Sequence, residues 1–380
     1  MKLAGDWIRA EALQRVLHLL TDAGHRAFLV GGCVRNALFG LPVTDIDIAT
    51  DAIPKRVQEL AVGSGLKVVP TGIEHGTVTI VVHGEPFEVT TFRRDVETDG
   101  RRATVAFAST VEEDASRRDF TMNALYADAD GCVIDPLDGL ADLQARRVRF
   151  VGDPDERIRE DYLRILRFFR FHALYGDAAA GMDEEALSSC AASSAGLTTL
   201  SKERIGHEMR RLLGAPDPAP AIAGMVATGV LGRILPGADH RGLAPLVHLD
   251  APYAPDWVRR LAVLGVGDGT DMLRLSREEA RRLAAMQAAI GNGAGAAEMA
   301  YRLGAETARD VVLLRAALSG SPLPDGWEDE IALGKKAMFP VRAADLQPGL
   351  EGGALGAKLN ELEERWIASA FQLTRDELLA

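Results

Sequence analysis

The chain has 380 residues, of which 47% are hydrophobic and 26% charged, and its formal net charge is −12. This length suffices for two or three domains with their own cores, and the composition is ordinary for a globular protein. The three cysteines are widely separated, which argues against a disulfide framework. The sequence has no apolar run long enough to cross a membrane, and its N-terminus is too polar for a signal peptide. These features predict a cytoplasmic protein.

The first informative segment is LVGGCVRNALFGLPVTDIDIAT, residues 29–50. An apolar strand leads into Gly31 and Gly32, and a short helix carrying Arg35 follows. Because glycine has no Cβ, backbone N–H groups at this turn can approach a phosphate, and the positive end of the helix favours an anion. The alternative interpretation is an ordinary tight turn.

Asp45 and Asp47 alternate with isoleucines in the strand that we expect next. Side chains two residues apart on a strand point to the same face, so both carboxylates face the same way. Two neighbouring carboxylates repel each other unless a cation lies between them, and hard oxygen ligands suit Mg²⁺. Glu88, on a later strand, is a candidate third acid. An exposed strand end is the alternative for each of them, but the combination with the glycine turn favours a metal–nucleotide site.

Several strands with few intervening helices predict a small mixed or antiparallel sheet over residues 1–151. Residues 93–114 are charged and without pattern, which indicates a mobile loop near the site. Helical order is expected again over residues 115–125. There, Arg118 can bind phosphate and Asn123 can bond a sugar hydroxyl, although a surface ion pair is an equal alternative for Arg118.

Beyond residue 152 the hydrophobic period becomes helical, and one helix is expected over residues 156–175. It carries a stripe of one acid and three arginines at three-residue spacing, which consists of Asp161, Arg164, Arg167 and Arg170. A solvated face is the usual meaning of such a stripe. Next to a nucleotide site, however, it would also form a reader of bases and phosphates, and the net acidic charge does not exclude RNA held by a local basic stripe.

The hydrogen-bonding groups of an Asp–Arg pair suit particular bases. Arginine only donates and an ionised aspartate only accepts, whereas cytosine and adenine each offer an amino donor beside a ring-nitrogen acceptor. Uracil and guanine would leave buried polar groups unpaired, at a cost of roughly 1–3 kcal/mol each. Asp161 and Arg164 would therefore select C and A without a template, provided that their helix faces the metal site.

The remainder of the chain reads as helical, with four to six further helices after residue 216 and a final helix near the C-terminus. The fold class that we expect is α+β, with an N-terminal head built on a small mixed sheet and an all-α remainder. No internal repeat is evident.

The ordered motifs VGGCVRN with DID, EVTTFRRD, RRDFTMNAL, DPLDG, REDYLRILRFFRF and SKERIGHEM resemble class II tRNA nucleotidyltransferases (CCA-adding enzymes), within the DNA polymerase β-like nucleotidyltransferase superfamily. The resemblance covers roughly the first 215 residues and continues more weakly beyond them. It implies a five-stranded catalytic head over residues 1–151, a helical neck over 152–215, a body over 216–310 and a tail over 311–380 that contacts tRNA.

The resemblance also implies roles for individual residues. Asp45 and Asp47 would bind Mg²⁺, with Glu88 as third acid, and Gly32, Arg35 and Arg118 would contact the nucleotide. The helical stripe would read the base and hold its phosphates, while Glu203, Arg204 and Glu208 would support the neck. The implied reaction adds C and A from CTP and ATP to the tRNA 3′ end, and no obligate protein partner is evident.

Three alternatives remain open at this point. A poly(A) polymerase and an A-adding or CC-adding enzyme of the same branch would share the metal site and differ in product. A catalytically silent RNA-binding protein belongs to a different class, and the intact acidic pair argues against it.

Overall fold

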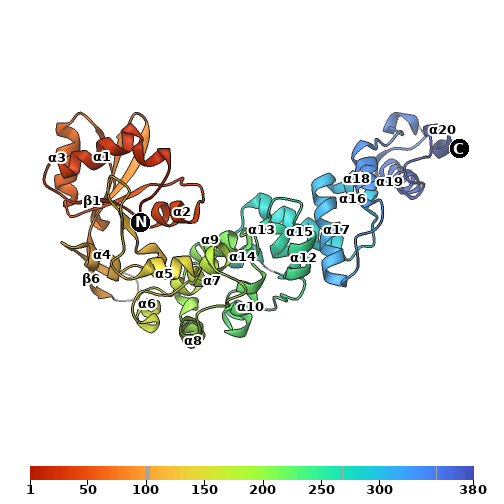
Figure 1. Cartoon of the computed structure of the whole chain (residues 1–380). Coiled ribbons are helices and arrows are strands. Elements are labelled where there is room, and N and C mark those ends of the chain that lie inside the picture. The colour runs from red at the N-terminus through yellow and green to blue at the C-terminus, as the bar shows by residue number, and fades with distance from the viewer. Residues whose placement is uncertain (99–102, 268, 348) are drawn as a thin grey trace. The chain divides into compact units, whose positions relative to one another are not determined.

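The computed structural model describes residues 1–98, 103–267, 269–347 and 349–380 (Figure 1). The chain forms two compact units. The first comprises Met1–Glu208 and Pro220–Ile234, and the second comprises Met209–Ala219 and Leu235–Ala380. No helix in the described parts of the chain is long and apolar enough to cross a membrane.

The first unit is built on a seven-stranded sheet with the strand order β3-β4-β5-β2-β1-β8-β9. Only β2 and β5 pair in parallel, and the other neighbours are antiparallel, so the predicted mixed sheet is confirmed. The resemblance implied five strands, whereas the sheet has seven, of which β8 and β9 have only two residues each. The strands of this sheet are β1 (Ala27–Val30), β2 (Asp47–Thr50), β3 (Lys67–Gly72), β4 (Thr77–Val82), β5 (Glu85–Thr91), β8 (Tyr126–Ala127) and β9 (Val133–Ile134).

Helices α1 and α3 pack together against the sheet (Figure 1). The apolar stripe of α1 is fully buried at Leu13, Val16, Leu17 and Leu20, as an amphipathic helix requires. The helices that precede β4 in the chain are η1 (Asp6–Arg9), α1 (Glu11–Thr21), α2 (Gly32–Phe39), α3 (Pro54–Gly63) and η2 (Ile73–His75).

The expectation of a mobile loop over residues 93–114 is wrong for the described part of that segment. Strands β6 (Arg93–Thr98) and β7 (Ala103–Phe107) form a separate antiparallel hairpin, and α4 (Val111–Ser116) follows it. The sequence of β6, RRDVET, is charged and gave no signal, whereas that of β7, ATVAF, has no charged residue and was available as a strand signal that the interpretation as a loop missed. Residues 99–102 of the predicted loop lie outside the described residues.

The continuous helical order expected over residues 115–125 is also wrong. Helix α4 ends at Ser116, and only a 3₁₀ turn, η3 (Thr121–Asn123), lies in the rest of the segment. An isolated bridge between Phe120 and Phe150 interrupts it. The short segment is thus shaped by its tertiary partners, since an isolated helix of this length is marginal.

The long helix expected over residues 156–175 is divided into α6 (Pro154–Glu160) and α7 (Leu163–Tyr175). Asp161 lies at the break in an extended conformation, with φ −154° and ψ 105°. The carboxylate of Asp161 accepts the backbone N–H of Leu163 at 3.0 Å, so the acid of the stripe starts the second helix instead of continuing the first.

The rest of the first unit is helical. It comprises α5 (Gly139–Gln144), α8 (Glu184–Ser193), η4 (Ser194–Thr199), α10 (Ala219–Ala227) and α11 (Val230–Ile234), and the long helix α9 (Lys202–Leu213) runs from this unit into the second.

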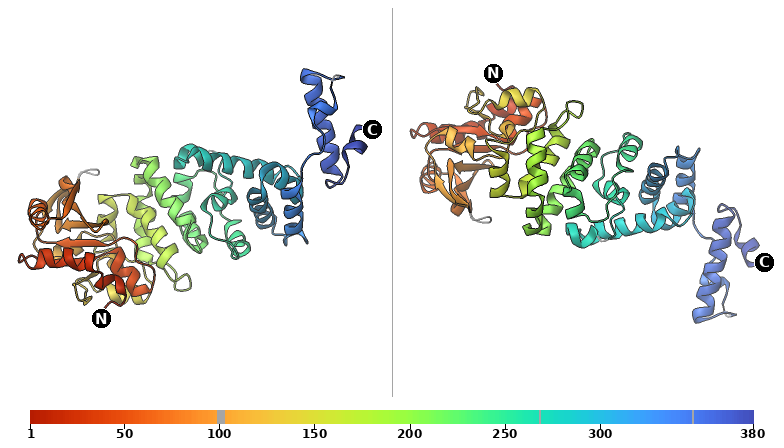
Figure 2. Two further views of the ribbon diagram at one scale, coloured as in Figure 1. Left: turned by 90° about the horizontal axis from the view of Figure 1, so that it is seen from above. Right: turned by 90° about the horizontal axis from the view of Figure 1, so that it is seen from below.

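The described part of the second unit contains helices and no β-strand (Figure 2). Together with α10 and α11, its helices up to α18 exceed the four to six that periodicity predicted. Four of them have only one or two turns, since α11 and α14 have five residues each and α12 and α13 seven. The helices of the second unit are α12 (Leu243–Leu249), α13 (Trp257–Val263), α14 (Gly269–Leu273), α15 (Arg277–Ile290), α16 (Ala296–Leu303), α17 (Ala305–Ser319), α18 (Trp327–Lys336), η5 (Ala343–Asp345), α19 (Gly352–Ala368) and α20 (Arg375–Leu379).

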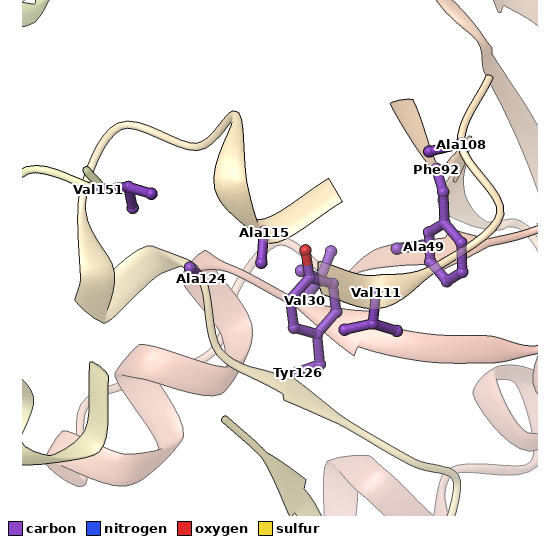
Figure 3. Close-up of a cluster of buried hydrophobic side chains, with 9 residues drawn as sticks. All are labelled: Val30, Ala49, Phe92, Ala108, Val111, Ala115, Ala124, Tyr126 and Val151. Atoms are coloured by element: carbon purple, nitrogen blue, oxygen red, sulfur yellow. The ribbon is translucent and has the colours of Figure 1, made fainter. Parts of the chain in front are cut away.

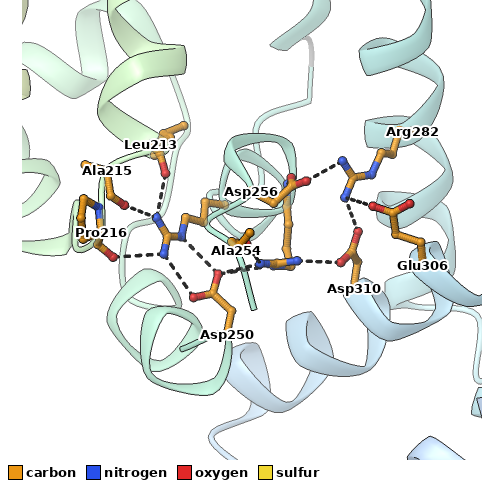
Figure 4. A network of polar contacts seen from close by, with 11 residues as sticks. Leu213, Ala215, Pro216, Asp250, Ala254, Asp256, Arg282, Glu306 and Asp310 are labelled. Carbon is orange, nitrogen blue, oxygen red and sulfur yellow. Dashed lines mark hydrogen bonds and ion pairs between the residues drawn. The ribbon is translucent and has the colours of Figure 1, made fainter. Parts of the chain in front are cut away.

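A buried ionic network holds the middle of the second unit together (Figure 4). Arg259 and Arg260 on α13 are each 2% exposed and both donate to Asp250. Arg259 also donates to Asp310 on α17, and Arg260 donates to the carbonyl of Leu213 at the end of α9. Each buried guanidinium is therefore paired with a carboxylate, which offsets the cost of removing it from water.

Candidate active site

Asp47 and Glu88 are neighbours in the sheet. Strands β2 and β5 pair in parallel with Asp47 opposite Glu88, so the third acid predicted from sequence lies beside the acidic pair. Asp45 precedes β2 and is exposed, which corrects its expected position on the strand. The pKa of Asp47 lies above its ordinary value because burial disfavours its charge and because the carboxylates of Glu88 and Asp45 repel it, although Arg118 acts in the opposite direction.

These three acids have the chemistry of a site for a hard divalent cation. Their mutual repulsion would be relieved by such an ion, and carboxylate oxygen is the ligand that it prefers. Among the described residues, no three His, Cys, Asp or Glu side chains are placed to hold a metal by themselves.

The turn before α2 explains why glycine occupies position 31. Gly31 has φ +71°, a left-handed conformation that favours glycine, and a Cβ there would lie 3.3 Å from Nη1 of Arg118. The N–H of Gly31 donates to the carbonyl of Leu125, whereas Gly32 is the first residue of α2. The glycine at position 31 thus lets Arg118 approach the turn.

A cavity of about 470 Å³ is lined both by Asp47 and Glu88 and by the arginine-rich helix, whereas Asp45 does not line it. Ten of its lining residues are charged. Six are arginines and four are acids, namely Arg93, Arg117, Arg118, Arg164, Arg167, Arg204, Asp47, Glu88, Asp119 and Asp161. The condition set by the sequence, that the stripe should face the metal site, is met for Asp161, Arg164 and Arg167. The excess of guanidinium groups suits an anionic ligand.

Asp161 and Arg164 both line the cavity but do not bond each other through their side chains. Asp161 accepts from Nη2 of Arg204 at 2.6 Å. The guanidinium of Arg164 is bonded to Glu160 and to the carbonyl of Arg157. The acceptor and the donor needed for reading a base therefore lie in the same cavity, each held by a separate partner.

Arg167 is fixed by Asp119. Its Nε donates to Oδ2 of Asp119 at 2.8 Å. Burial opposes the ionisation of Asp119, but Arg167, Asn123 and Arg164 together outweigh it, and the pKa of this carboxyl lies below its ordinary value. Asp119 also accepts from Nδ2 of Asn123. An ionised acid at the cavity wall thus holds one of the stripe arginines in place.

Arg35, Asn123 and Arg170 do not line the cavity. Arg35 is 7% exposed and donates to Asn123 and, at 2.8 Å, to the hydroxyl of Tyr175. Arg170 is 2% exposed and is paired with Glu208 on α9. All three lie behind the cavity wall, and their direct contact with a nucleotide stays a prediction.

Some lining residues were not among the candidates from sequence. Arg117 and Asp119 belong to the RRD motif, and that motif was the available signal. Arg204 was assigned only to support of the neck, whereas Thr77 and Arg93 come from elements whose fold had to be known first.

Comparison with known proteins agrees with this geometry. Residues 27–149 match the family described as "Poly A polymerase head domain", and residues 181–241 match "Probable RNA and SrmB- binding site of polymerase A". The chain is 33% identical to the mouse protein named CCA tRNA nucleotidyltransferase 1, mitochondrial, over 97% of this chain and 89% of that protein. It is 35% identical to the CCA-adding enzyme of Geobacillus stearothermophilus over 86% of this chain and 82% of that enzyme.

A solved structure gives the same result at the level of the fold. The crystal structure of the Bacillus stearothermophilus CCA-adding enzyme in complex with CTP has a TM-score of 0.72 and 30% sequence identity, and covers 94% of this chain and 93% of that one. Together with an α+β fold in which Asp47, Glu88 and the arginine-rich helix line one cavity, these similarities show that the chain belongs to the CCA-adding enzyme family of nucleotidyltransferases.

Proposed function

We propose that this protein adds C and A nucleotides from CTP and ATP to the 3′ end of tRNA, without a template and with release of pyrophosphate. The observation that carries the proposal is the single cavity lined by Asp47 and Glu88 on one side and by Asp161, Arg164 and Arg167 on another. Curated relatives named CCA-adding enzyme, similar over most of both chains, support the same reaction.

The metal that we propose is Mg²⁺, held by Asp45 and Asp47 with Glu88 as third acid. When bound there, such an ion polarises phosphate oxygen and favours the ionised form of an attacking hydroxyl. The protein's own part is to provide the carboxylates. The pKa of Asp47 is raised mainly by burial and also by the repulsion of Glu88 and Asp45, and the ion would relieve that repulsion.

The arginines of the cavity would bind the triphosphate. A guanidinium presents several N–H donors in a plane and pairs with phosphate oxygens in a bidentate manner. Arg118 and Arg167 are each oriented by a carboxylate, Asp114 and Asp119 respectively, so little side-chain freedom is lost when an anion binds. We keep two further groups of residues as proposed nucleotide-binding residues. Gly31 and Gly32 lie at the turn. For Arg35 and Asn123 behind it, and for Arg170 at the neck, we infer an indirect role.

Base selection would depend on Asp161 and Arg164. The carboxylate accepts the amino group of cytosine or adenine, and the guanidinium donates to the ring nitrogen beside it. Arg204 orients Asp161 through their 2.6 Å contact. Arg164 has to release or share its contacts with Glu160 and Arg157 when it donates to a base.

We also propose a role for each domain and a cellular location for the protein. The head over residues 1–151 would carry the chemistry and the neck over 152–215 the base recognition. The helices over 216–310 would form the body, and the tail over 311–380 would contact the tRNA. A cytoplasmic location fits the cysteine usage of the chain.

The experiment that tests the proposal supplies tRNA transcripts ending before C, after C and after CC, together with labelled CTP or ATP and Mg²⁺. Addition of C and A that stops at CCA is the expected result. Addition of A alone would reassign the protein to the A-adding or polyadenylating enzymes, and addition that stops at CC to the CC-adding ones. No incorporation by a protein that still binds tRNA would leave an RNA-binding protein without catalysis.

A further inference from the structure

Asp114 on α4 is a buried acid with an unusual number of donors. It is 1% exposed. Its carboxylate accepts from the hydroxyl of Tyr126 at 2.7 Å, from Nη2 of Arg118 at 2.9 Å, from Nε of Arg117 at 3.0 Å and from the backbone N–H of Arg93 at 3.2 Å. Four donors on one carboxylate fill its acceptor positions.

Three of these four donors belong to residues that line the cavity, namely Arg93, Arg117 and Arg118, whereas Asp114 itself does not line it. The carboxylate therefore stands behind the wall of the nucleotide cavity and joins two separate segments of that wall. They are the first residue of β6 and the segment after α4, in which the guanidinium of Arg118 packs against the turn at Gly31.

The position of Asp114 is fixed from the other side by apolar packing. Val111 and Ala115 of the same helix belong to a buried cluster that also contains Val30 and the ring of Tyr126 (Figure 3). The hydroxyl of that tyrosine accepts from Nε of Arg118 at 3.0 Å while it donates to Asp114. The apolar cluster thus fixes the position of Asp114, and Asp114 and Tyr126 together fix the orientation of the Arg118 guanidinium.

The charge of Asp114 is secured by its partners. Burial opposes its ionisation, but Arg118 and Arg117 outweigh this effect, and the pKa of the carboxyl lies well below its ordinary value. Arg118 uses Nε and one N–H of Nη2 for Tyr126 and Asp114. A guanidinium has five N–H donors, so three remain for a ligand in the cavity.

We propose that Asp114 is a positioning residue for nucleotide binding, which orients Arg118 and Arg117 toward the phosphates before the nucleotide arrives. This inference rests on the proposed function. Because the phosphates are common to CTP and ATP, the orientation serves both nucleotides equally and has no part in the choice of base. Asp114 acts through the arginines and does not touch the nucleotide.

The test compares Asp114→Asn with the wild-type protein. The amide keeps the shape but removes the charge and one acceptor. Equilibrium binding of CTP and of ATP is measured without tRNA, together with KM, kcat and the ratio of kcat/KM for CTP and UTP. We expect both nucleotide dissociation constants to rise about tenfold, which corresponds to about 1.4 kcal/mol, with an unchanged KM for tRNA and an unchanged CTP/UTP ratio.

Asp142 provides a matched control in the same unit. It is 0% exposed and also pairs with two arginines, Arg147 and Arg149, and with the hydroxyl of Thr121. Neither of these arginines lines the cavity. We expect Asp142→Asn to lower the thermal midpoint while the dissociation constants for CTP and ATP stay at the wild-type values.

Two further variants distinguish positioning from general stability. Asp114→Asn combined with Arg118→Ala should weaken nucleotide binding little more than Arg118→Ala alone, since residues that act through one another are not additive. Tyr126→Phe removes only the bridging hydroxyl and should weaken the binding of both CTP and ATP. This variant can therefore replace Asp114→Asn if that variant does not fold.

Wild-type nucleotide affinity in folded Asp114→Asn, or fully additive losses in the double variant, would overturn the inference and leave the proposed function intact. If Asp114→Asn does not fold, unchanged binding of CTP and ATP by Tyr126→Phe would overturn it in the same way. A wild-type protein that binds neither CTP nor ATP would instead contradict the proposed function itself.

Discussion

Replacing Asp161 by asparagine should impair the choice between cytosine and uracil. The carboxylate of Asp161 already accepts from the N–H of Leu163 at 3.0 Å and from Arg204 at 2.6 Å. Two of about four lone-pair positions are thus occupied, and those that remain can meet only a donor on the base. In Asp161→Asn, Arg204 should still donate to the side-chain oxygen, so the NH₂ group of the new amide points away from Arg204. A donor then faces the amino group of cytosine, which is itself a donor.

The size of the effect follows from one mismatched buried group. An unpaired donor or acceptor costs about 1–3 kcal/mol, so the CTP/UTP ratio of kcat/KM should fall by about 5- to 150-fold. The assay is single-nucleotide addition to a tRNA transcript that ends before the first C, with each nucleotide supplied separately. Glu156→Gln, an exposed change on α6, is the control and should leave the ratio unchanged. If Asp161→Asn keeps the wild-type ratio, our reasoning about base selection is wrong.

Three other predictions concern the charged groups of both units. Asp47→Asn should reduce nucleotide transfer about a thousandfold, since a lost metal ligand removes about 4 kcal/mol of transition-state stabilisation. Because the folded pKa of Asp47 is raised, its charge costs stability above that pKa, so the same variant without metal should melt higher than wild type at neutral pH; a lower midpoint would contradict this. Asp119 has a lowered folded pKa, so its contribution is complete above the unfolded value of about 3.9 and is lost as pH falls through the folded one. Urea midpoints of wild type and Asp119→Asn should therefore differ at neutral pH and converge in acid, and a constant difference would count against the assignment. Asp250→Ala leaves two buried guanidinium groups without their shared partner and should lower the free energy of unfolding of the second unit by about 3–5 kcal/mol, whereas Glu298→Ala, which breaks a surface pair, should cost at most about 1 kcal/mol in denaturant titration.

The chemistry of the site was largely predictable from the sequence. The glycine turn, the acids at positions 45, 47 and 88, and the arginine stripe are residue types whose charge and hydrogen-bonding groups do not depend on the fold. The α+β class followed as well, because the change from a period of two to a period of 3.6 near residue 152 is a property of the sequence itself.

The placement of individual side chains was not predictable in this way. Arg170 has the same spacing as Arg164 and Arg167, yet it is buried against Glu208, since only the packing of α7 on α9 determines which side of the stripe faces the cavity. The hairpin of β6 and β7 was not predicted, because backbone pairing leaves no pattern in the charged sequence of β6 and the short apolar run of β7 was not interpreted as its partner.

The sequence by itself thus determined which groups are available for nucleotide chemistry and in which half of the chain they lie. Tertiary structure alone decided which of them meet, as at Asp47 and Glu88, where two strands separated by some 40 residues pair in register. It also decided which acids hold the arginines, as at Asp114 and Asp119. The physical reason is that a charge is a local property of one residue, whereas its partner, its burial and its pKa arise only when distant segments pack together.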